Sequence, residues 1–217
     1  MDVTAALAEV RRRIGDEVRI VAVTKGHGVD AVQAALAAGL TDVGESYAQE
    51  LREKAAVGGV SWHFVGRLQT NKVRQVADLV HLWQPVDRDE LADEIARRAP
   101  GAAVLVQVNV SGEPQKGGCD PADVAALVAR CADIGLGVRG LMTVGHPADP
   151  RPGFRLLAGL ADDLGLPERS MGMSGDLEIA VEEGATMVRV GRALFGPRPR
   201  TPRTVTVGSR PERPLEG

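Results

Sequence analysis

From Arg19 onward the sequence alternates between short runs rich in β-branched residues and longer segments rich in alanine and leucine. This alternation is typical of repeated strand–helix units, in which parallel strands form one sheet and helices cover it. Eight runs have the composition of strands, and they end at Thr24, Gly44, Gly66, Trp83, Val110, Val144, around Met173 and at Gly191. Eight such units predict a single closed (β/α)8 barrel of the TIM type.

Helices are expected between these strands because apolar residues recur there at spacings of three and four. The segments are 30–38, 47–56, 71–76, 88–98, 121–132, 152–164 and 176–183, and an extra N-terminal helix is expected at 3–14. Helix starts leave backbone N–H groups that need an acceptor. We expect these acceptors to be Asp30, Asn71, Asp87 and Asp120, which precede or open four of the segments.

An open, doubly wound sheet is the alternative architecture. Its dinucleotide-binding form needs the pattern GxGxxG after the first strand. The chain instead reads TKGHG at 24–28, which lacks the third glycine and has a lysine where backbone would approach a pyrophosphate. The barrel is therefore preferred.

The domain organisation follows from length and composition. A chain of 217 residues with a hydrophobic content of 44% suits one domain with one substantial core. We assign residues 1–196 to the barrel. Residues 197–217 are rich in proline and arginine and poor in apolar residues, so this tail is expected to be disordered.

The charge pattern indicates a small-molecule partner, with no nucleic acid and no membrane. The formal net charge is −3, and acidic and basic residues are interspersed. The opening segment lacks the apolar core of a signal peptide, and no later apolar run is long enough to span a bilayer. We expect a cytoplasmic, monomeric protein.

Only two cysteines occur, Cys119 and Cys131. They show neither a CxxC motif nor a cysteine–histidine ligand spacing. Free thiols are expected, and no metal site is predicted.

Lys25 is the first candidate functional residue. Ligands of such barrels bind at the loops that follow the C-terminal ends of the strands, and Lys25 directly follows the apolar run IVAVT. Apolar or cationic neighbours disfavour the charged form of a lysine, and the neutral amine condenses with aldehydes. An exposed lysine just past a strand end is the simpler alternative, because most lysines are exposed.

Two glycine-containing segments have the character of phosphate sites. In MGMSGD at 171–176, a strand is expected to turn into a helix, which makes backbone N–H groups and the Ser174 hydroxyl available to an anion. In VRVGR at 188–192, Gly191 lets the backbone approach a ligand closely. Phosphates in these barrels typically bind after the seventh and eighth strands, where both segments fall. Taken singly, each also fits an ordinary helix start or strand end.

Longer motifs occur in a fixed order, namely VAVTK, VGESYAQEL, WHFVGRLQTNK, VQVNVSGEPQKGG, RGLMTV, MGMSGDLEIAVEEGATMVRVG and ALFG. Together they resemble the pyridoxal phosphate homeostasis protein family, which is related to the N-terminal barrel of alanine racemase. The resemblance runs from about Val21 to Gly196, and its most specific part is the pair MGMSGDLE and MVRVG. It implies a barrel that binds pyridoxal 5′-phosphate (PLP).

The resemblance also implies roles for individual residues. Lys25 would hold PLP as a Schiff base, the internal aldimine, and Arg189 would face the pyridine nitrogen. The cofactor phosphate would be bound by Ser174, Gly175, Gly191 and the backbone of Arg192.

Three features depart from the usual family pattern. Ser46 replaces an asparagine, so a side-chain contact near the cofactor is shortened or lost. Arg192 replaces a threonine or serine, and its guanidinium would substitute for the lost hydroxyl only if it points inward. The segment 146–152 is short, which should leave the barrel mouth more open.

The expected cofactor environment argues against catalysis. A guanidinium stays protonated, so Arg189 would donate to the pyridine nitrogen and leave the ring a poor electron sink. A racemase also needs an acid–base group opposite the lysine. Related racemases supply a tyrosine from a second domain, which is not expected here, and the sole tyrosine, Tyr47, is expected to pack near the mouth. No histidine has a carboxylate at a telling spacing.

We therefore expect a non-catalytic PLP-binding protein of intracellular PLP (vitamin B6) homeostasis. Beyond PLP, its candidate partners are apo PLP-dependent enzymes or amino acids. A PLP-dependent racemase-like enzyme is one alternative, which turnover of amino acids would reveal. A barrel that binds a phosphorylated metabolite without a Schiff base is another, which the absence of a visible absorption band would reveal.

Overall fold

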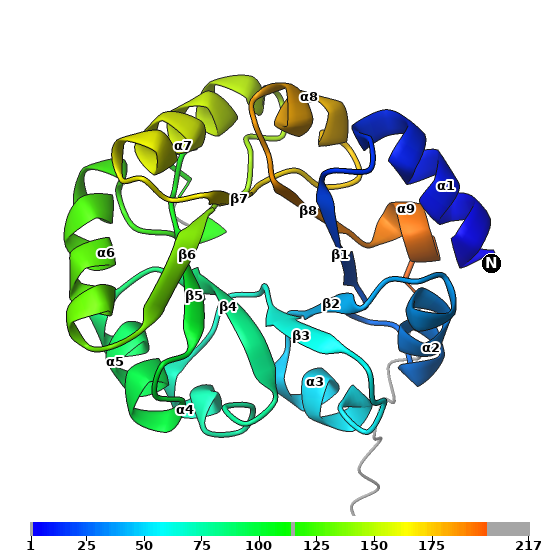
Figure 1. Cartoon of the computed structure of the whole chain (residues 1–217), viewed down its shortest axis with the longest axis horizontal. Helices are drawn as coiled ribbons and strands as arrows, with labels where there is room; N and C mark the ends of the chain where they lie inside the picture. Colours follow the sequence, from blue (N-terminus) through cyan, green and yellow to red (C-terminus); the bar gives the residue numbers. More distant parts are fainter. Residues whose placement is uncertain (1, 114–115, 199–217) are drawn as a thin grey trace, which may run out of the picture.

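The fold is a closed barrel of eight parallel strands, seen in a computed structural model that describes residues 2–113 and 116–198. The strands follow one another around the ring in chain order, and the first pairs with the last (Figure 1). They are β1 (Arg19–Val23), β2 (Asp42–Glu45), β3 (Ser61–Phe64), β4 (Val80–Val86), β5 (Ala103–Gln107), β6 (Gly137–Met142), β7 (Glu168–Ser170) and β8 (Met187–Val190). The predicted (β/α)8 barrel is confirmed.

Helices form the outer ring (Figure 1). They are α2 (Val29–Ala37), α3 (Ala48–Lys54), α4 (Thr70–Val73), α5 (Asp89–Arg98), the 3-10 turn η2 (Pro121–Asp123), α6 (Val124–Asp133), α7 (Arg151–Asp163), α8 (Leu177–Glu182) and α9 (Arg192–Phe195). The extra N-terminal helix is also confirmed as α1 (Val3–Ile14), which packs against α8 and α9. Asp2 caps it by accepting a hydrogen bond from the N–H of Ala5.

The structure differs from the sequence-based expectation at the last two strands. The seventh strand ends at Ser170, so Met173 lies in a loop. The chain turns at Gly172, whose φ of +96° favours glycine and whose Cβ would lie 2.5 Å from the Cβ of Ala180. The short helix α9 after the eighth strand was not predicted.

Helix capping was predicted correctly at one of four positions. Asp120 accepts a hydrogen bond from Ala122 at the start of η2. At the other starts the cap positions are Gly28, Gln69 and Arg88, none of which forms a side-chain cap bond. The predictions at Asp30, Asn71 and Asp87 are therefore wrong, because each lies one or two residues from the position that leads into the helix.

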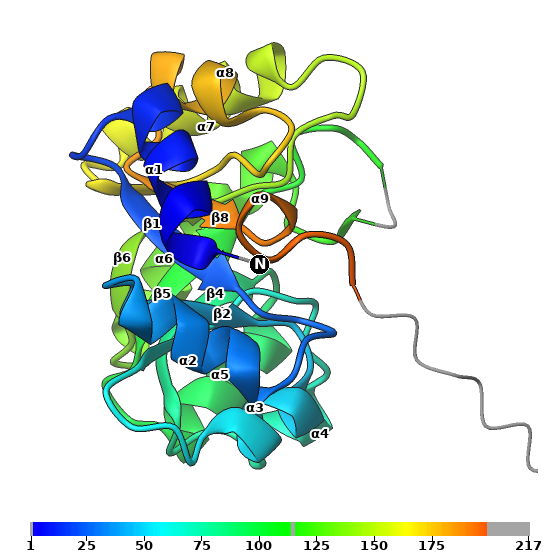
Figure 2. The ribbon, with the colours of Figure 1, turned by 90° about the vertical axis from the view of Figure 1, so that its right-hand side faces the viewer.

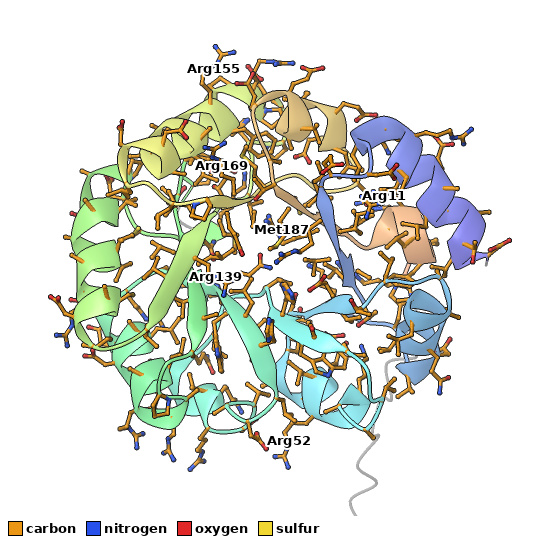
Figure 3. All side chains as sticks on the ribbon, viewed as in Figure 1. Arg11, Arg52, Arg139, Arg155, Arg169 and Met187 are labelled. Carbon is orange, nitrogen blue, oxygen red and sulfur yellow. The ribbon has the colours of Figure 1, made fainter. Side chains whose placement is uncertain are left out.

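The core has two parts. The larger cluster lies between the strands and the helices. A smaller cluster comprises Val21, Leu82, Leu105, Met142 and Met187, and Met187 points into the ring of strands (Figure 3). Four polar side chains that are at most 5% exposed accompany it, namely His63, Gln84, Ser170 and Arg189. Each of these polar groups needs a hydrogen-bond partner, because a buried polar group without one destabilises the fold. The hydrogen bonds therefore fix how these side chains are arranged inside the barrel.

The assignment of residues 1–196 to the barrel and of 197–217 to a disordered tail stays a prediction, since residues 199–217 lie outside the part of the chain that the structure describes. The chain leaves the barrel next to α9 (Figure 2). Within 2–113 and 116–198, no helix is long and apolar enough to cross a bilayer. Cys119 and Cys131 are free thiols.

Candidate functional site

Lys25 lies two residues beyond the end of β1 and is half-buried. Burial lowers the pKa of its amine, and the positive charges of Arg198 and Arg189 lower it further. Glu45 and Glu50 act in the opposite direction without cancelling the effect. Because a lowered pKa increases the neutral fraction, the amine is better suited to nucleophilic attack than an exposed lysine.

Arg189, on β8, is a buried cation that is hydrogen-bonded to residues at the ends of β6 and β7. Its Nη1 donates to the carbonyl oxygen and the hydroxyl of Ser170 at 2.8 and 2.7 Å, and its Nη2 donates to the carbonyl of Thr143 at 2.6 Å. Burial lowers its pKa to about 10, against a weak opposing effect of Asp176. No carboxylate of the described residues forms an ion pair with it. An uncompensated buried charge favours an anion or a strong acceptor beside it.

A chain of hydrogen bonds extends from Arg189 across the barrel interior. The Ser170 hydroxyl donates to Gln84 at 2.7 Å, and the Gln84 amide nitrogen lies 2.9 Å from Nδ1 of His63. Nε2 of His63 lies 2.9 Å from Asp42. The pattern fits an imidazole with its proton on Nε2, since the amide donates to Nδ1. This series of hydrogen bonds fixes the Ser170 side chain and, through it, the guanidinium of Arg189.

Asp42 and His63 were not recognised in the sequence because they are 21 positions apart and meet only through strand pairing. Burial raises the pKa of Asp42, but the hydrogen bond of His63 and nearby positive charges outweigh it and hold the pKa below its usual value. The sequence offered one sign of this pair, namely that each polar side chain lies within or next to an apolar strand run.

The two predicted phosphate segments lie together. The backbone N–H of Ala193 donates to the Ser174 hydroxyl at 3.2 Å, which joins the loop after β7 to the start of α9. Gly191 packs against the end of β1, where a Cβ would lie 3.0 Å from the carbonyl oxygen of Val23. Gly175 has open space around it. Backbone N–H groups and one hydroxyl therefore converge at this end of the barrel.

The expectation for Tyr47 is wrong, and the condition set for the Arg192 guanidinium is not met. Tyr47 is 58% exposed at the start of α3, so it does not pack at the mouth as expected. Arg192 is exposed, and its side chain forms no ion pair or hydrogen bond with the described residues. An inward guanidinium that replaces the missing hydroxyl is therefore not seen.

An open groove of about 1330 Å³ lies beside the mouth, between α3 and α4. Its lining includes Ser46, Tyr47, Arg67 and Lys72, but neither Lys25 nor the loops after β7 and β8. The groove is therefore a surface feature separate from the candidate site around Lys25. The backbones of Ser46 and Gly66 approach closely here, since a Cβ on Gly66 would lie 2.5 Å from the Ser46 carbonyl oxygen.

Residues 2–199 match the model of the family described as alanine racemase, N-terminal domain. The chain is 43% identical over 209 residues to the pyridoxal phosphate homeostasis protein of Deinococcus radiodurans, which covers 90% of this chain and 100% of the relative. It is 41% identical over 213 residues to the protein of the same name from Pseudomonas aeruginosa, which covers 90% of this chain and 93% of the relative.

Solved structures give the same picture. PipY of Synechococcus elongatus, determined with PLP bound, superposes with a TM-score of 0.82 at 32% identity, over 89% of this chain and 100% of that one. An alanine racemase of Clostridium difficile superposes with a TM-score of 0.77 over 91% of this chain and 57% of that one. Its 16% identity supports the fold alone.

Proposed function

Because this chain belongs to the alanine racemase N-terminal domain family, as one of its pyridoxal phosphate homeostasis proteins, we propose that it binds PLP through a Schiff base on Lys25. We further propose that it acts in intracellular PLP homeostasis without catalysis of its own. The observation that carries the proposal is a half-buried amine of lowered pKa near a buried guanidinium that lacks a carboxylate partner among the described residues. The proposal includes a cytoplasmic, monomeric protein that supplies apo PLP-dependent enzymes or responds to amino acids.

The residues present fit the chemical groups of PLP, which supplies an aldehyde, a phosphate and a pyridine nitrogen when bound. The neutral Lys25 amine would be the group that condenses with the aldehyde, with loss of water. The Ser174 hydroxyl, which accepts from the N–H of Ala193, and the backbone N–H groups of Gly175, Gly191 and Arg192 would be donors for the phosphate. The N–H groups of Arg189 that Ser170 and Thr143 do not use are donors for the pyridine nitrogen.

We expect purified protein supplied with PLP to be yellow, because a Schiff base absorbs in the visible range. Borohydride reduction should fix the pyridoxyl group on Lys25, since this is the lysine at the end of β1 with a lowered pKa. Absorption spectroscopy followed by peptide mapping tests the assignment. The chain has three further lysines, Lys54, Lys72 and Lys116. A pyridoxyl group on one of these would contradict the proposed site, and the absence of a band would favour a phosphate-binding barrel without a Schiff base.

We also expect negligible racemase, transaminase or decarboxylase turnover. The bonds of Arg189 to Ser170 and Thr143 keep a cation in the interior, which disfavours protonation of the pyridine nitrogen. Tyr47, the sole tyrosine, is 58% exposed and lines the separate groove, so it is a poor candidate for the acid–base group that a racemase needs opposite its lysine. Assays with D- and L-amino acids under saturating PLP check this. Turnover of about 1 s⁻¹ or more, near the ordinary enzyme range, would establish the racemase-like alternative.

A further inference from the structure

A cluster of three charged side chains, two of them buried, lies next to Lys25. Glu45 ends β2, and Glu50 and Lys54 are one turn apart on α3. Nζ of Lys54 is 2.6 Å from Glu45 Oε1 and 3.0 Å from Glu50 Oε2. Glu45 is 0% and Lys54 3% exposed. Burial raises the pKa of Glu45, although its bonds to Lys54 and Thr24 oppose this. Such a cluster is stable only with well-placed partners, so its geometry is tightly specified.

The cluster is bonded to both peptide groups of Lys25. Nζ of Lys54 donates to the carbonyl oxygen of Thr24 at 2.9 Å, which belongs to the peptide that precedes Lys25. The N–H of Gly26, in the peptide that follows Lys25, donates to Oε2 of Glu50 at 2.7 Å. The Thr24 hydroxyl donates to Glu45 at 2.6 Å, which holds the preceding residue a second time. The backbone of Lys25 is therefore fixed from both sides.

The backbone turns sharply at this point. Gly26 has a φ of +74°, in the left-handed region that favours glycine. Its N–H would lose its acceptor without Glu50, and the turn would lose the bond that fixes it to α3. The backbone conformation around Lys25 thus depends on the side chains of Glu50 and Lys54, which belong to α3.

We propose that Glu45, Glu50 and Lys54 are positioning residues, which clamp the two peptide groups of Lys25 so that its amine meets the aldehyde of PLP in a reactive geometry. This inference rests on the proposed function. Condensation requires the nitrogen within about 3–3.5 Å of the carbonyl carbon, and small misplacements slow such reactions strongly. The clamp acts through the backbone, so it controls the rate of bond formation and not the binding of the phosphate.

The cluster also acts on Lys25 through charge, and an experiment must separate the two effects. Besides burial, the charged groups that act on Lys25 are Arg198, Arg189, Glu45 and Glu50, of which the two carboxylates raise its pKa. Loss of the Glu50 charge should lower this pKa further. Loss of the clamp should reduce the rate at which the neutral amine reacts, which is the plateau of the rate at high pH.

The test compares Glu50→Ala and Glu50→Gln by stopped-flow measurement of Schiff-base formation with PLP across pH. Glu50 is chosen because it is partly exposed, whereas changes at Glu45 or Lys54 leave a buried charge unpaired. Glu50→Ala removes both charge and acceptor, and its plateau rate should fall by about tenfold or more. Glu50→Gln keeps an acceptor oxygen for Gly26, so its plateau should stay within about twofold of the wild type. Both profiles should shift to lower pH.

Glu53→Ala is the matched control, because Glu53 lies on the same helix, is exposed and, among the described residues, bonds only to Gln49. Binding of pyridoxine 5′-phosphate, which has no aldehyde, should be equal in all four proteins and excludes misfolding as the cause. Acetylation of the apo protein with acetic anhydride, resolved by peptide, reports the pKa of Lys25 without any cofactor. Its midpoint should fall in both Glu50 variants while that of Lys72 stays constant.

The outcomes are distinct. A Glu50→Ala plateau equal to that of Glu53→Ala would overturn the clamp. Equal plateau losses in Glu50→Ala and Glu50→Gln would also overturn it, because charge alone would then explain the effect. A wild-type protein that forms no adduct at Lys25 would contradict the proposed function, and the inference with it.

Discussion

Lys25→Ala is expected to abolish the visible absorption band of the PLP complex while retaining phosphate-dependent binding. The change removes the amine of lowered pKa just after β1, so no carbon–nitrogen bond can form there. It leaves the donors that converge around Ser174 and Gly191 in place. Charge-assisted hydrogen bonds contribute roughly 1–3 kcal/mol each, so PLP should still bind at least about tenfold more tightly than pyridoxal.

Equilibrium dialysis of PLP and of pyridoxal measures this difference, with circular dichroism to check the fold. Lys72→Ala is the matched control, because Lys72 is an exposed lysine on α4 outside the predicted site. It should keep the band and both affinities. If Lys25→Ala bound pyridoxal as tightly as PLP, the phosphate would contribute nothing and the site at the ends of β7 and β8 would be wrong.

The barrel could be predicted from the sequence because strands and helices differ in their hydrophobic pattern. Strands are short β-branched runs, and helices have apolar residues at spacings of three and four. Even the N-terminal helix was predicted with its bounds, Val3–Ile14. The errors occur where local signals are weak. The seventh strand has only three residues, and the small residues of MGMSG that follow it were read as its continuation. The helix α9 has four residues, which is too short for a period of 3.6 to show.

The candidate site was predictable only in part. Lys25, Ser174 and Gly191 follow strands, so the rule that ligands bind at strand ends identified them. Arg189 lies within a strand and was assigned only through the resemblance. Its partners, Ser170 and Thr143, come from the ends of two other strands, β7 and β6. The cluster beside Lys25 joins residues 21 and 30 positions apart.

Such pairs depend on strand register and on the packing of a helix against a strand. Neither leaves a pattern in a single sequence. One local trace existed, the spacing of four between Glu50 and Lys54, which is usual for an exposed helical ion pair. It could not show that Lys54 would be buried against Glu45.

Arg189→Gln is expected to weaken PLP binding by about tenfold to a hundredfold and to leave the barrel folded. A glutamine is shorter and uncharged, so it cannot bridge Ser170 and Thr143 and still donate to the pyridine nitrogen. The loss corresponds to roughly 1–3 kcal/mol, the usual range for hydrogen bonds from charged donors. Ser174→Ala, which removes a neutral donor to the phosphate, should weaken binding toward the lower end of the same range.

The stability of the apo protein should change little in Arg189→Gln, because two effects oppose each other. The guanidinium is buried without a carboxylate partner among the described residues, so its removal relieves a desolvation cost. The bonds to Ser170 and Thr143 are lost at the same time. We expect the apo melting temperature to shift by less than about 4 °C, which is the range for 1 kcal/mol in a chain of this size.

Fluorescence titration with PLP measures the affinity, and calorimetric melting of the apo protein measures the melting temperature separately. Arg139→Gln is the control, because Arg139 is exposed in the first half of β6, toward the end of the barrel away from the mouth. Within residues 2–113 and 116–198 its side chain bonds only to Glu168. Unlike Lys25→Ala, Arg189→Gln should keep the visible band at saturating PLP, since the lysine is intact. An unchanged PLP affinity in Arg189→Gln would mean that the buried guanidinium serves only to join the ends of β6, β7 and β8, and that the pyridine nitrogen is bound by another group.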